Sequence, residues 1–194
     1  MDPYKQLELL LPSVMSPDRY GLRKELKYLI QKSRKNKSKA EDKYQLLKLE
    51  RKINLSIHKK EWRRKNTPKF SYNPELPITA KKKEIIEAIK NNNIEIISGE
   101  TGSGKTTQLP KFCLAAGRGI NGIIGCTQPR RIAAITIANR IAEELGENVG
   151  NSVGYKIRFD ERIGENSFIK IMTDGILLAE TQSDPFLNAY DTII

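Results

Sequence analysis

Hydrophobic positions in the second half of the chain form short continuous runs that alternate with longer stretches of helical spacing. Short apolar runs bounded by Gly, Asn or Asp are typical of strands in a sheet that is covered on both faces. The predicted strands are residues 94–97 (short and buried), 122–127, 153–159, 168–172 and 190–194. The predicted helices between them are residues 106–115, 131–145 and 174–182. This alternation predicts an α/β fold in which helices flank a parallel sheet.

The first third of the chain has a helical pattern instead. Residues 16–18, Ser-Pro-Asp, supply an N-cap, a proline at the first helical position and an acidic first turn. The apolar stripe expected on this helix is Tyr20, Leu26, Leu29 and Ile30. Polar, Lys-rich residues 31–39 predict a linker or a frayed turn. A second helix is expected at residues 40–60, with one apolar face made by Leu46, Leu49, Ile53 and Ile57.

Three prolines between residues 67 and 77 mark a boundary. Beyond it, Thr79 is the expected N-cap of a helix that ends at the asparagines of residues 91–93. The buried residues expected on that helix are Ile85, Ile86 and Ile89. The sequence therefore predicts a basic helical segment at residues 1–66, a proline-containing linker at residues 67–77 and an α/β domain at residues 78–194.

Charge divides the chain in the same way. The net charge is +11, but residues 1–83 carry 23 Lys and Arg against 9 Asp and Glu, whereas residues 84–194 carry 11 against 14. A basic segment beside a faintly acidic domain favours a polyanionic partner, most often nucleic acid. The alternative is that these Lys-rich helices are simply solvated.

Other residue types exclude several classes of site. Cys113 and Cys126 lack metal-ligand spacing and fall in apolar stretches, which predicts reduced core residues in a cytoplasmic protein. The single histidine, His58, is expected at the surface. No run of about 20 apolar residues occurs, so no membrane span is expected.

Residues 99–106, Gly-Glu-Thr-Gly-Ser-Gly-Lys-Thr, fit the phosphate-binding loop pattern G-x-x-x-x-G-K-[ST] at every required position. The glycines allow successive backbone amides to point at one phosphate, and the following helix adds the positive end of its dipole. Lys105 can reach the β- and γ-phosphates, and the Thr106 hydroxyl can ligate Mg²⁺. The predicted nucleotide-binding residues are Gly99, Glu100, Thr101, Gly102, Ser103, Gly104, Lys105, Thr106 and Thr107.

Two further motifs narrow the class of nucleotide-binding protein. Thr-Gln-Pro-Arg-Arg at residues 127–131 follows the second predicted strand, and Thr-Asp-Gly-Ile-Leu at residues 173–177 follows a later one. With the loop, and in this order, residues 76–194 resemble the first RecA-like domain of the DEAH-box RNA helicases of superfamily 2, the bacterial HrpA type above all. The resemblance covers about the last three-fifths of the chain.

This resemblance implies roles for individual residues. ATP and Mg²⁺ are the implied cofactors, and Arg140 is the arginine that stacks on adenine, unless it is only a surface arginine on an amphipathic helix. RNA is the implied partner, contacted mainly through its backbone and hence with little regard to base sequence. The residues implied in that contact are Arg130, Arg131, Thr173, Asp174 and Gly175, although Arg131 could instead only brace its helix.

One family motif is missing. Asp-Glu-Ala-His, which holds Mg²⁺ and positions the attacking water in the family, does not occur in these residues, and Asp174 and Asp191 are poor substitutes. We therefore expect the amino-terminal part of a longer ATP-dependent RNA helicase, truncated before that motif. No residue within the chain is then catalytic, and the chain binds ATP weakly and hardly hydrolyses it.

Two other functions stay open. The first is a non-catalytic adaptor that binds nucleotide or RNA without turnover, and the second is a phosphate-binding-loop ATPase that acts on proteins. Under the helicase reading, the protein is expected to be a monomer. Its basic first segment is expected to add salt-sensitive affinity for RNA, since each neutralised phosphate releases counterions.

Overall fold

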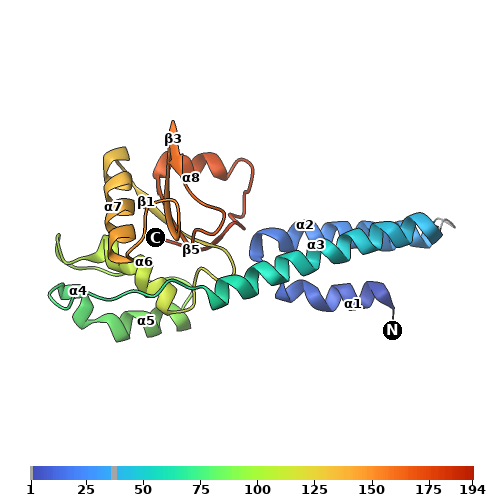
Figure 1. Ribbon diagram of the computed structural model, residues 1–194, viewed down its shortest axis with the longest axis horizontal. Helices are drawn as coiled ribbons and strands as arrows, with labels where there is room; N and C mark the ends of the chain where they lie inside the picture. Colours follow the sequence, from blue (N-terminus) through green and yellow to red (C-terminus); the bar gives the residue numbers. More distant parts are fainter. Residues whose placement is uncertain (1, 36–38) are drawn as a thin grey trace. The chain divides into compact units, whose positions relative to one another are not determined.

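The structure, a computed structural model, describes residues 2–35 and 39–194 (Figure 1). The chain divides into two compact units, Met1–Asn66 and Thr67–Ile194. The first unit is helical, and the second is an α/β domain.

The first unit contains α1 (Pro3–Leu10), a 3₁₀ turn (Leu11–Ser13), α2 (Ser16–Lys35) and α3 (Lys39–Lys65). Helices α2 and α3 run alongside one another, with α1 against them (Figure 1). Their core is small and made mostly of leucine: Leu7, Leu11, Val14, Leu22, Leu26, Leu29, Leu49 and Ile53. The face predicted for the second helix is confirmed, since Leu49 and Ile53 are fully buried and Leu46 and Ile57 pack against them.

Two expectations for this unit are wrong. Residues 31–35 continue α2 as helix, because their straight-chain and polar side chains are compatible with helical backbone and no Gly or Pro interrupts them; residues 36–38 lie outside the described residues. Tyr20 does not belong to the buried stripe, because it is 66% exposed. Leu22 is buried instead, since positions 22, 26 and 29 share one face of the helix.

The second unit is a five-stranded sheet with helices. Its strands are β1 (Ile123–Gln128), β2 (Val153–Ile157), β3 (Asp160–Arg162), β4 (Ile169–Thr173) and β5 (Tyr190–Ile193), in the order β3-β2-β4-β1-β5. Its helices are α4 (Pro77–Ala80), α5 (Lys82–Asn91), α6 (Lys105–Ala115), α7 (Arg131–Glu144) and α8 (Asp174–Glu180). All pairings are parallel except that of β2 with β3. The predicted fold class is confirmed.

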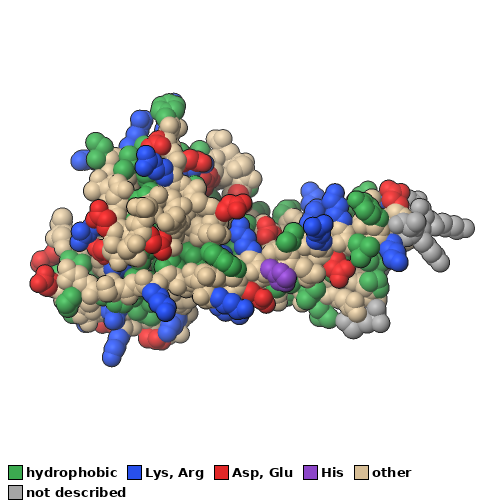
Figure 2. Space-filling view, in the orientation of Figure 1, with side chains coloured by type: hydrophobic (Ala, Val, Ile, Leu, Met, Phe, Trp, Pro, Cys, Tyr) green, Lys and Arg blue, Asp and Glu red, His purple; other side chains and the backbone are tan. Residues whose placement is uncertain are grey.

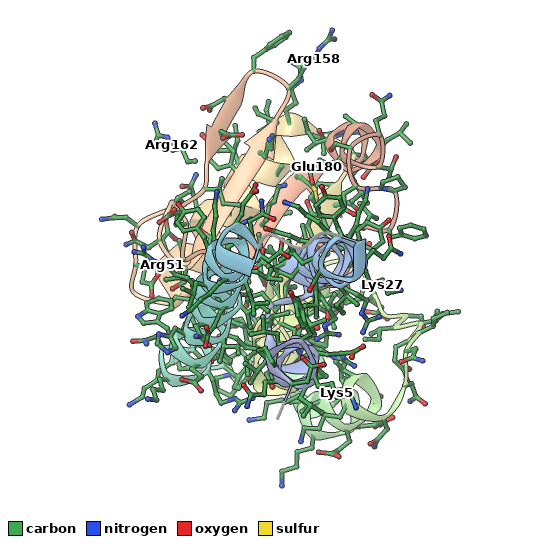
Figure 3. All side chains as sticks on the ribbon, turned by 90° about the vertical axis from the view of Figure 1, so that its right-hand side faces the viewer. Lys5, Lys27, Arg51, Arg158, Arg162 and Glu180 are labelled. Carbon is green, nitrogen blue, oxygen red and sulfur yellow. The ribbon has the colours of Figure 1, made fainter. Side chains whose placement is uncertain are left out.

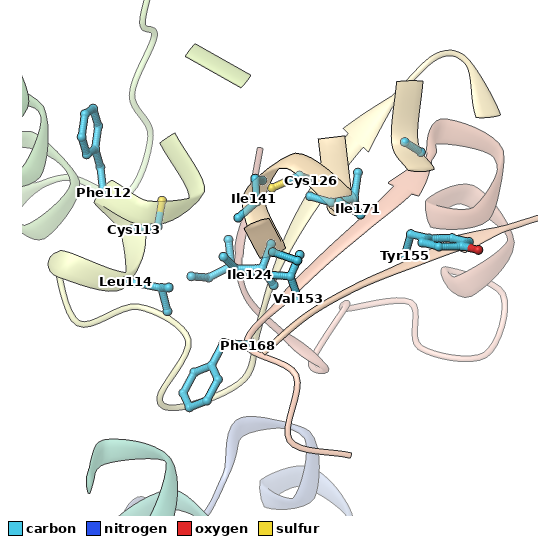
Figure 4. Packing of buried hydrophobic residues seen from close by; sticks show 14 of the residues in the cluster. Phe112, Cys113, Leu114, Ile124, Cys126, Ile141, Val153, Tyr155, Phe168 and Ile171 are labelled. Atoms are coloured by element: carbon cyan, nitrogen blue, oxygen red, sulfur yellow. The ribbon is translucent and has the colours of Figure 1, made fainter. Parts of the chain in front are cut away.

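Alternate strand residues define the two faces of the sheet. Ile124, Val153 and Ile171 belong to the large core that includes α6 and α7 (Figure 4). Lys170 of β4 faces the other way, toward α8, where its ammonium donates to Glu180 (2.6 Å) and to the Tyr190 hydroxyl oxygen (2.8 Å). Helices therefore cover both faces, as the continuous apolar runs of β1 and β4 predict.

Three local predictions for this unit are wrong. Residues 94–97 belong to no strand and no helix, and Ile94 and Ile96 are 85% and 92% exposed. A strand needs a hydrogen-bonded neighbour. Residues 94–97 and the edge strand β5 both line a cavity of about 790 Å³, so the segment does not pair with that strand. The run at residues 153–159 is a strand only to Ile157, after which the chain turns into the antiparallel β3. Thr79 lies inside α4 and donates to the Asn73 carbonyl, because Pro77 already occupies the first turn.

Candidate functional site: a phosphate-binding loop beside a basic strand edge

The loop at residues 99–104 leads directly into α6. Gly102 and Gly104 have φ of +83° and +91°, a region that L side chains rarely adopt, so glycine is required at both turns. A Cβ on Gly104 would also lie 3.0 Å from Leu76 Cδ1. The Ile78 amide donates to the Ser103 carbonyl (3.2 Å) and ties the loop to α4. The backbone thus curls at the start of α6, where the first-turn amides of a helix have no intrahelical partner.

Lys105 folds back over this loop. Its ammonium donates to the carbonyls of Gly99 (2.5 Å) and Glu100 (2.7 Å) and to Ser103 Oγ (3.2 Å). These are neutral acceptors, so the charge is held at the loop without a carboxylate partner among the described residues. Thr106 is exposed on the first turn of α6, and the Thr107 hydroxyl donates to the Gly104 carbonyl (3.3 Å).

A buried polar cluster joins α6 to α7. Glu144 Oε2 accepts from Lys111 Nζ (2.6 Å) and Gln108 Nε2 (2.9 Å), and its Oε1 accepts from Arg140 Nε (3.0 Å). Burial of Glu144 opposes its charged form. The bonds from Lys111 and Gln108, with the charges of Lys111 and Arg140, nonetheless hold the pKa of this carboxyl below its usual value. The helix that carries the loop is thereby linked to Arg140.

Arg140 itself lies on the outer side of α7, with 58% of its side chain exposed. Besides Glu144, it approaches Glu143 at 3.9 Å. These two carboxylates orient the guanidinium and leave much of it open to solvent. Its predicted role on adenine stays a prediction.

The other two motifs meet at one edge of the sheet. Strands β1 and β4 are parallel neighbours, and their last residues, Gln128 and Thr173, are register partners. Arg130 is the N-cap residue of α7 and Thr173 is that of α8, and neither side chain bonds to its own helix end. Residues predicted from two motifs more than 40 positions apart are thus neighbours in space.

Exposure at this edge suits contact with a large partner. Arg130 and Arg131 are exposed, as are Asp174 and Gly175 at the start of α8, while Thr173 is half-buried. A Cβ on Gly175 would meet nothing within 4 Å, so the backbone there is open to approach. Within residues 39–194, no carboxylate pairs with Arg130 or Arg131.

Sequence reasoning missed two residues beside this edge. Phe159, in the turn between β2 and β3, is 81% exposed. The guanidinium carbons of Arg158 and Arg131 lie 5.0 Å and 5.9 Å from its ring centroid. Figure 3 shows Arg158 at the tip of the β2–β3 hairpin. The available signal was an aromatic residue next to an arginine at the end of the apolar run at residues 153–159. Because the whole run was predicted to be one strand, the turn that exposes these residues was not expected.

Other candidate residues have structural surroundings. Asp191 accepts from the amides of Gly119 (2.8 Å) and Asn121 (3.3 Å), so its carboxylate is engaged at the start of β5. Cys113 and Cys126 are buried free thiols, and burial raises the pKa of Cys113 to about 12. His58 is exposed on α3. In the part of the chain that the structure describes, neither a cluster of metal-ligating side chains nor a helix long and apolar enough to cross a bilayer occurs.

The mostly parallel sheet and the loop at the start of α6 define a RecA-like nucleotide-binding fold. Comparison with known proteins names the family. The chain is homologous to HrpA and to the DEAH-box ATP-dependent RNA helicases.

The similarity is high but covers little of each relative. The chain is 51% identical over 127 residues to the ATP-dependent RNA helicase HrpA of Escherichia coli K12, which is 66% of the chain and 10% of HrpA. It is 50% identical over 119 residues to the HrpA homolog of Haemophilus influenzae, 61% of the chain and 9% of that protein. It is 52% identical over 126 residues to the ATP-dependent RNA helicase DEAH13 of Arabidopsis thaliana, which is 62% of the chain and 10% of that protein. The chain thus spans about a tenth of the length of these relatives, and no protein-family model matches it.

Proposed function

We propose that this chain supplies the nucleotide-binding loop and part of the RNA-binding surface of an ATP-dependent RNA helicase. The observation that carries the proposal is the pairing of Gln128 with Thr173, which brings two helicase motifs to one strand edge in the unit that also holds the loop. Identity of about 50% to HrpA and its relatives supports the same function.

The loop residues fit ATP. Lys105 exchanges its bonds to the Gly99 and Glu100 carbonyls for bonds to phosphate oxygens, which as anions are stronger acceptors. Backbone amides at the start of α6 bind the same phosphates. The exposed Thr106 hydroxyl ligates Mg²⁺, which neutralises phosphate charge when bound. Arg140 stacks on the adenine face, and Glu144 holds its guanidinium in place.

The surface at the carboxyl ends of β1 and β4 fits RNA. Arg130 and Arg131 neutralise phosphates, and Thr173 donates its hydroxyl to the backbone. Asp174 and Gly175 shape the approach at the start of α8. Because phosphates and sugars carry no base identity, binding through these groups is largely independent of sequence. Phe159 adds a ring on which a base can stack.

Binding of labelled ATP and of a fluorescein-labelled single-stranded RNA to the 194-residue chain tests both parts together. Lys105→Ala should abolish ATP binding and leave RNA affinity unchanged. Arg130→Ala should lower RNA affinity by about tenfold or more, since a charged hydrogen bond is worth about 1.5–3 kcal/mol, and leave ATP affinity unchanged. The matched control is Lys83→Ala, which removes one exposed positive charge from α5 and should change neither affinity.

Equal losses of ATP and RNA affinity in the Arg130→Ala protein would contradict the separate roles. A chain that binds ATP but whose RNA affinity does not depend on Arg130 would favour an ATPase that acts on another partner. Slow ATP turnover by the chain alone is expected under this proposal, so turnover is tested with the chain placed within a full-length helicase.

A further inference from the structure

One face of α2 exposes cations and aromatic rings together. Arg23, Lys24 and Lys27 are exposed, and Tyr20 and Tyr28, at 66% and 59% exposure, flank them. At about 100° of rotation per residue, these five side chains fall within an arc of about 140°. Among the described residues, no hydrogen bond, ion pair or ring contact involves any of the five. We call this surface the α2 basic face.

The acidic residues of α2 lie outside this arc and are already engaged. Asp18 accepts from the Ser56 hydroxyl (2.6 Å), and Glu25 accepts from Lys52 (2.8 Å), both toward α3. The buried leucines of the helix occupy the opposite side. The three cations of the α2 basic face are therefore not offset by a neighbouring carboxylate on the same face.

The exposed side of α3 also carries cations and a ring, since Lys43, Lys48 and Arg51 lie near Tyr44, which is 69% exposed. It differs from the α2 basic face because Glu50 and exposed Leu47 and Leu55 share its surface. Figure 3 shows Lys27 and Arg51 pointing away from the two helices on different sides, and Figure 2 shows Lys and Arg side chains gathered over the α2–α3 hairpin. A charge-matched comparison between the two helices is therefore possible within one unit.

We propose that the α2 basic face binds single-stranded RNA, with the three cations on phosphates and the two tyrosines stacked on bases. The proposal rests on the proposed function for its choice of polyanion. Proteins that bind single strands combine positive charge with exposed aromatic rings on which bases stack, and this face combines both. From Tyr20 to Tyr28 the helix rises about 12 Å, which matches about three phosphates at about 3.4 Å per nucleotide of a stacked strand.

The composition of this face argues against a membrane surface. A helix that lies in a bilayer interface presents Leu, Phe or Trp beside its basic residues. The other exposed residues within or directly beside this arc are Pro17, Gly21 and Gln31, none of which is a Leu, Phe or Trp anchor. Tyrosine hydroxyls also keep the two rings partly polar.

The first test removes the charges. In the 194-residue chain, Arg23, Lys24 and Lys27 are changed together to Gln, and anisotropy of a fluorescein-labelled uridine 12-mer is measured at several KCl concentrations. The slope of log K against log salt should become less steep by about 2, since each contact with a single-strand phosphate contributes about 0.7. The control changes Lys43, Lys48 and Arg51 of α3 to Gln, which removes the same net charge and should alter the slope by well under 1.

The second test removes the rings. Tyr20→Leu and Tyr28→Leu should each weaken RNA binding by about 5- to 150-fold, the value of stacking one base, with the salt slope unchanged. Tyr20→Phe and Tyr28→Phe keep the ring and should keep the affinity. Circular dichroism melting of each variant verifies that the helices remain folded, and a Leu variant that melts early is replaced by the Gln variant at the same position, which also lacks the ring.

Three outcomes would overturn the proposal. The first is an unchanged slope in the α2 charge variant, and the second is equal slope changes in the α2 and α3 variants, which would indicate non-specific attraction. The third is retained RNA affinity with lost binding to phosphatidylglycerol vesicles, which would assign the face to a membrane. Failure of the proposed function would give a different result. In that case Arg130→Ala would leave RNA affinity unchanged, whereas the α2 variants would lower it.

Discussion

Removal of the Glu144 carboxylate should destabilise the α/β unit by several kcal/mol. Lys111 is the reason, because only 1% of its side chain is exposed and its ammonium has two close acceptors, Glu144 Oε2 at 2.6 Å and the Ser71 carbonyl at 2.9 Å. In the Glu144→Ala protein, this buried charge keeps only neutral partners, the Ser71 carbonyl and the Tyr72 ring, whose centroid is 5.4 Å away. Loss of one partner of a buried ion pair costs about 3–5 kcal/mol. Gln108, fully buried, loses the closer of its two acceptors in the same substitution and keeps the Thr107 hydroxyl oxygen (3.2 Å).

Hydrogen exchange is the suitable assay. The single tryptophan, Trp62, is part of the first unit, whereas the assay must follow α6 and α7 themselves. Exchange of amides in these two helices, followed by mass spectrometry, gives the free energy of opening of the second unit directly. We expect that free energy to fall by about 3–5 kcal/mol in Glu144→Ala.

Two comparisons sharpen this prediction. Glu143→Ala removes a carboxylate with 69% of its side chain exposed from the same helix and should change the free energy by less than about 0.5 kcal/mol. The double variant Lys111→Met/Glu144→Leu replaces the pair by apolar groups and should recover most of the loss. A loss below about 1 kcal/mol in Glu144→Ala, or a double variant as unstable as the single one, would refute the assignment of the cost to an unpaired Lys111.

Three further predictions follow from the same unit. Gly104→Ala should lower ATP affinity and cost about 1–2 kcal/mol of stability, measured by urea unfolding, because φ is +91° there; an unchanged affinity would contradict the loop geometry. Cys113 and Cys126 should resist iodoacetamide at pH 8 in the folded protein and react in urea, followed by mass spectrometry, since burial raises the pKa of both thiols. The folded protein lowers the pKa of Glu144 and Glu180. Their contribution to stability is therefore present above the ordinary pKa of 4.5 and is lost as pH falls through the pKa values of the folded protein. Urea unfolding from pH 6 to pH 3 should show this loss, and a flat profile would contradict it.

Local sequence was sufficient for elements with a strong chemical or periodic pattern. The loop at residues 99–106 and the motif after β1 were found because their residue types and spacing are themselves the chemistry. Helices α6 and α7 began and ended within a residue of their predicted limits. The boundaries were clear because apolar positions repeat with helical spacing between Gly and Pro.

Features that depend on distant partners were not predictable. The apolar run at residues 94–97 has the local pattern of a strand, but pairing is decided elsewhere in the sheet. Strand β3 is three charged residues, Asp160–Arg162, and has no hydrophobic signal. The bond between Lys111 and Glu144 spans 33 positions. Tyr20 was misplaced because its ring was counted as apolar, whereas helical spacing from Leu26 puts Leu22 on the buried face.

The central claim, that this chain works as part of an ATP-dependent RNA helicase, is tested most directly in a chimera. The matching stretch of Escherichia coli HrpA, 127 residues at 51% identity, is replaced by the corresponding residues of this chain, and ATP turnover is measured with and without single-stranded RNA. We predict RNA-stimulated turnover that Lys105→Ala abolishes. A chimera that binds ATP and RNA but does not hydrolyse ATP, while HrpA does, would contradict the claim and favour a binding-only adaptor.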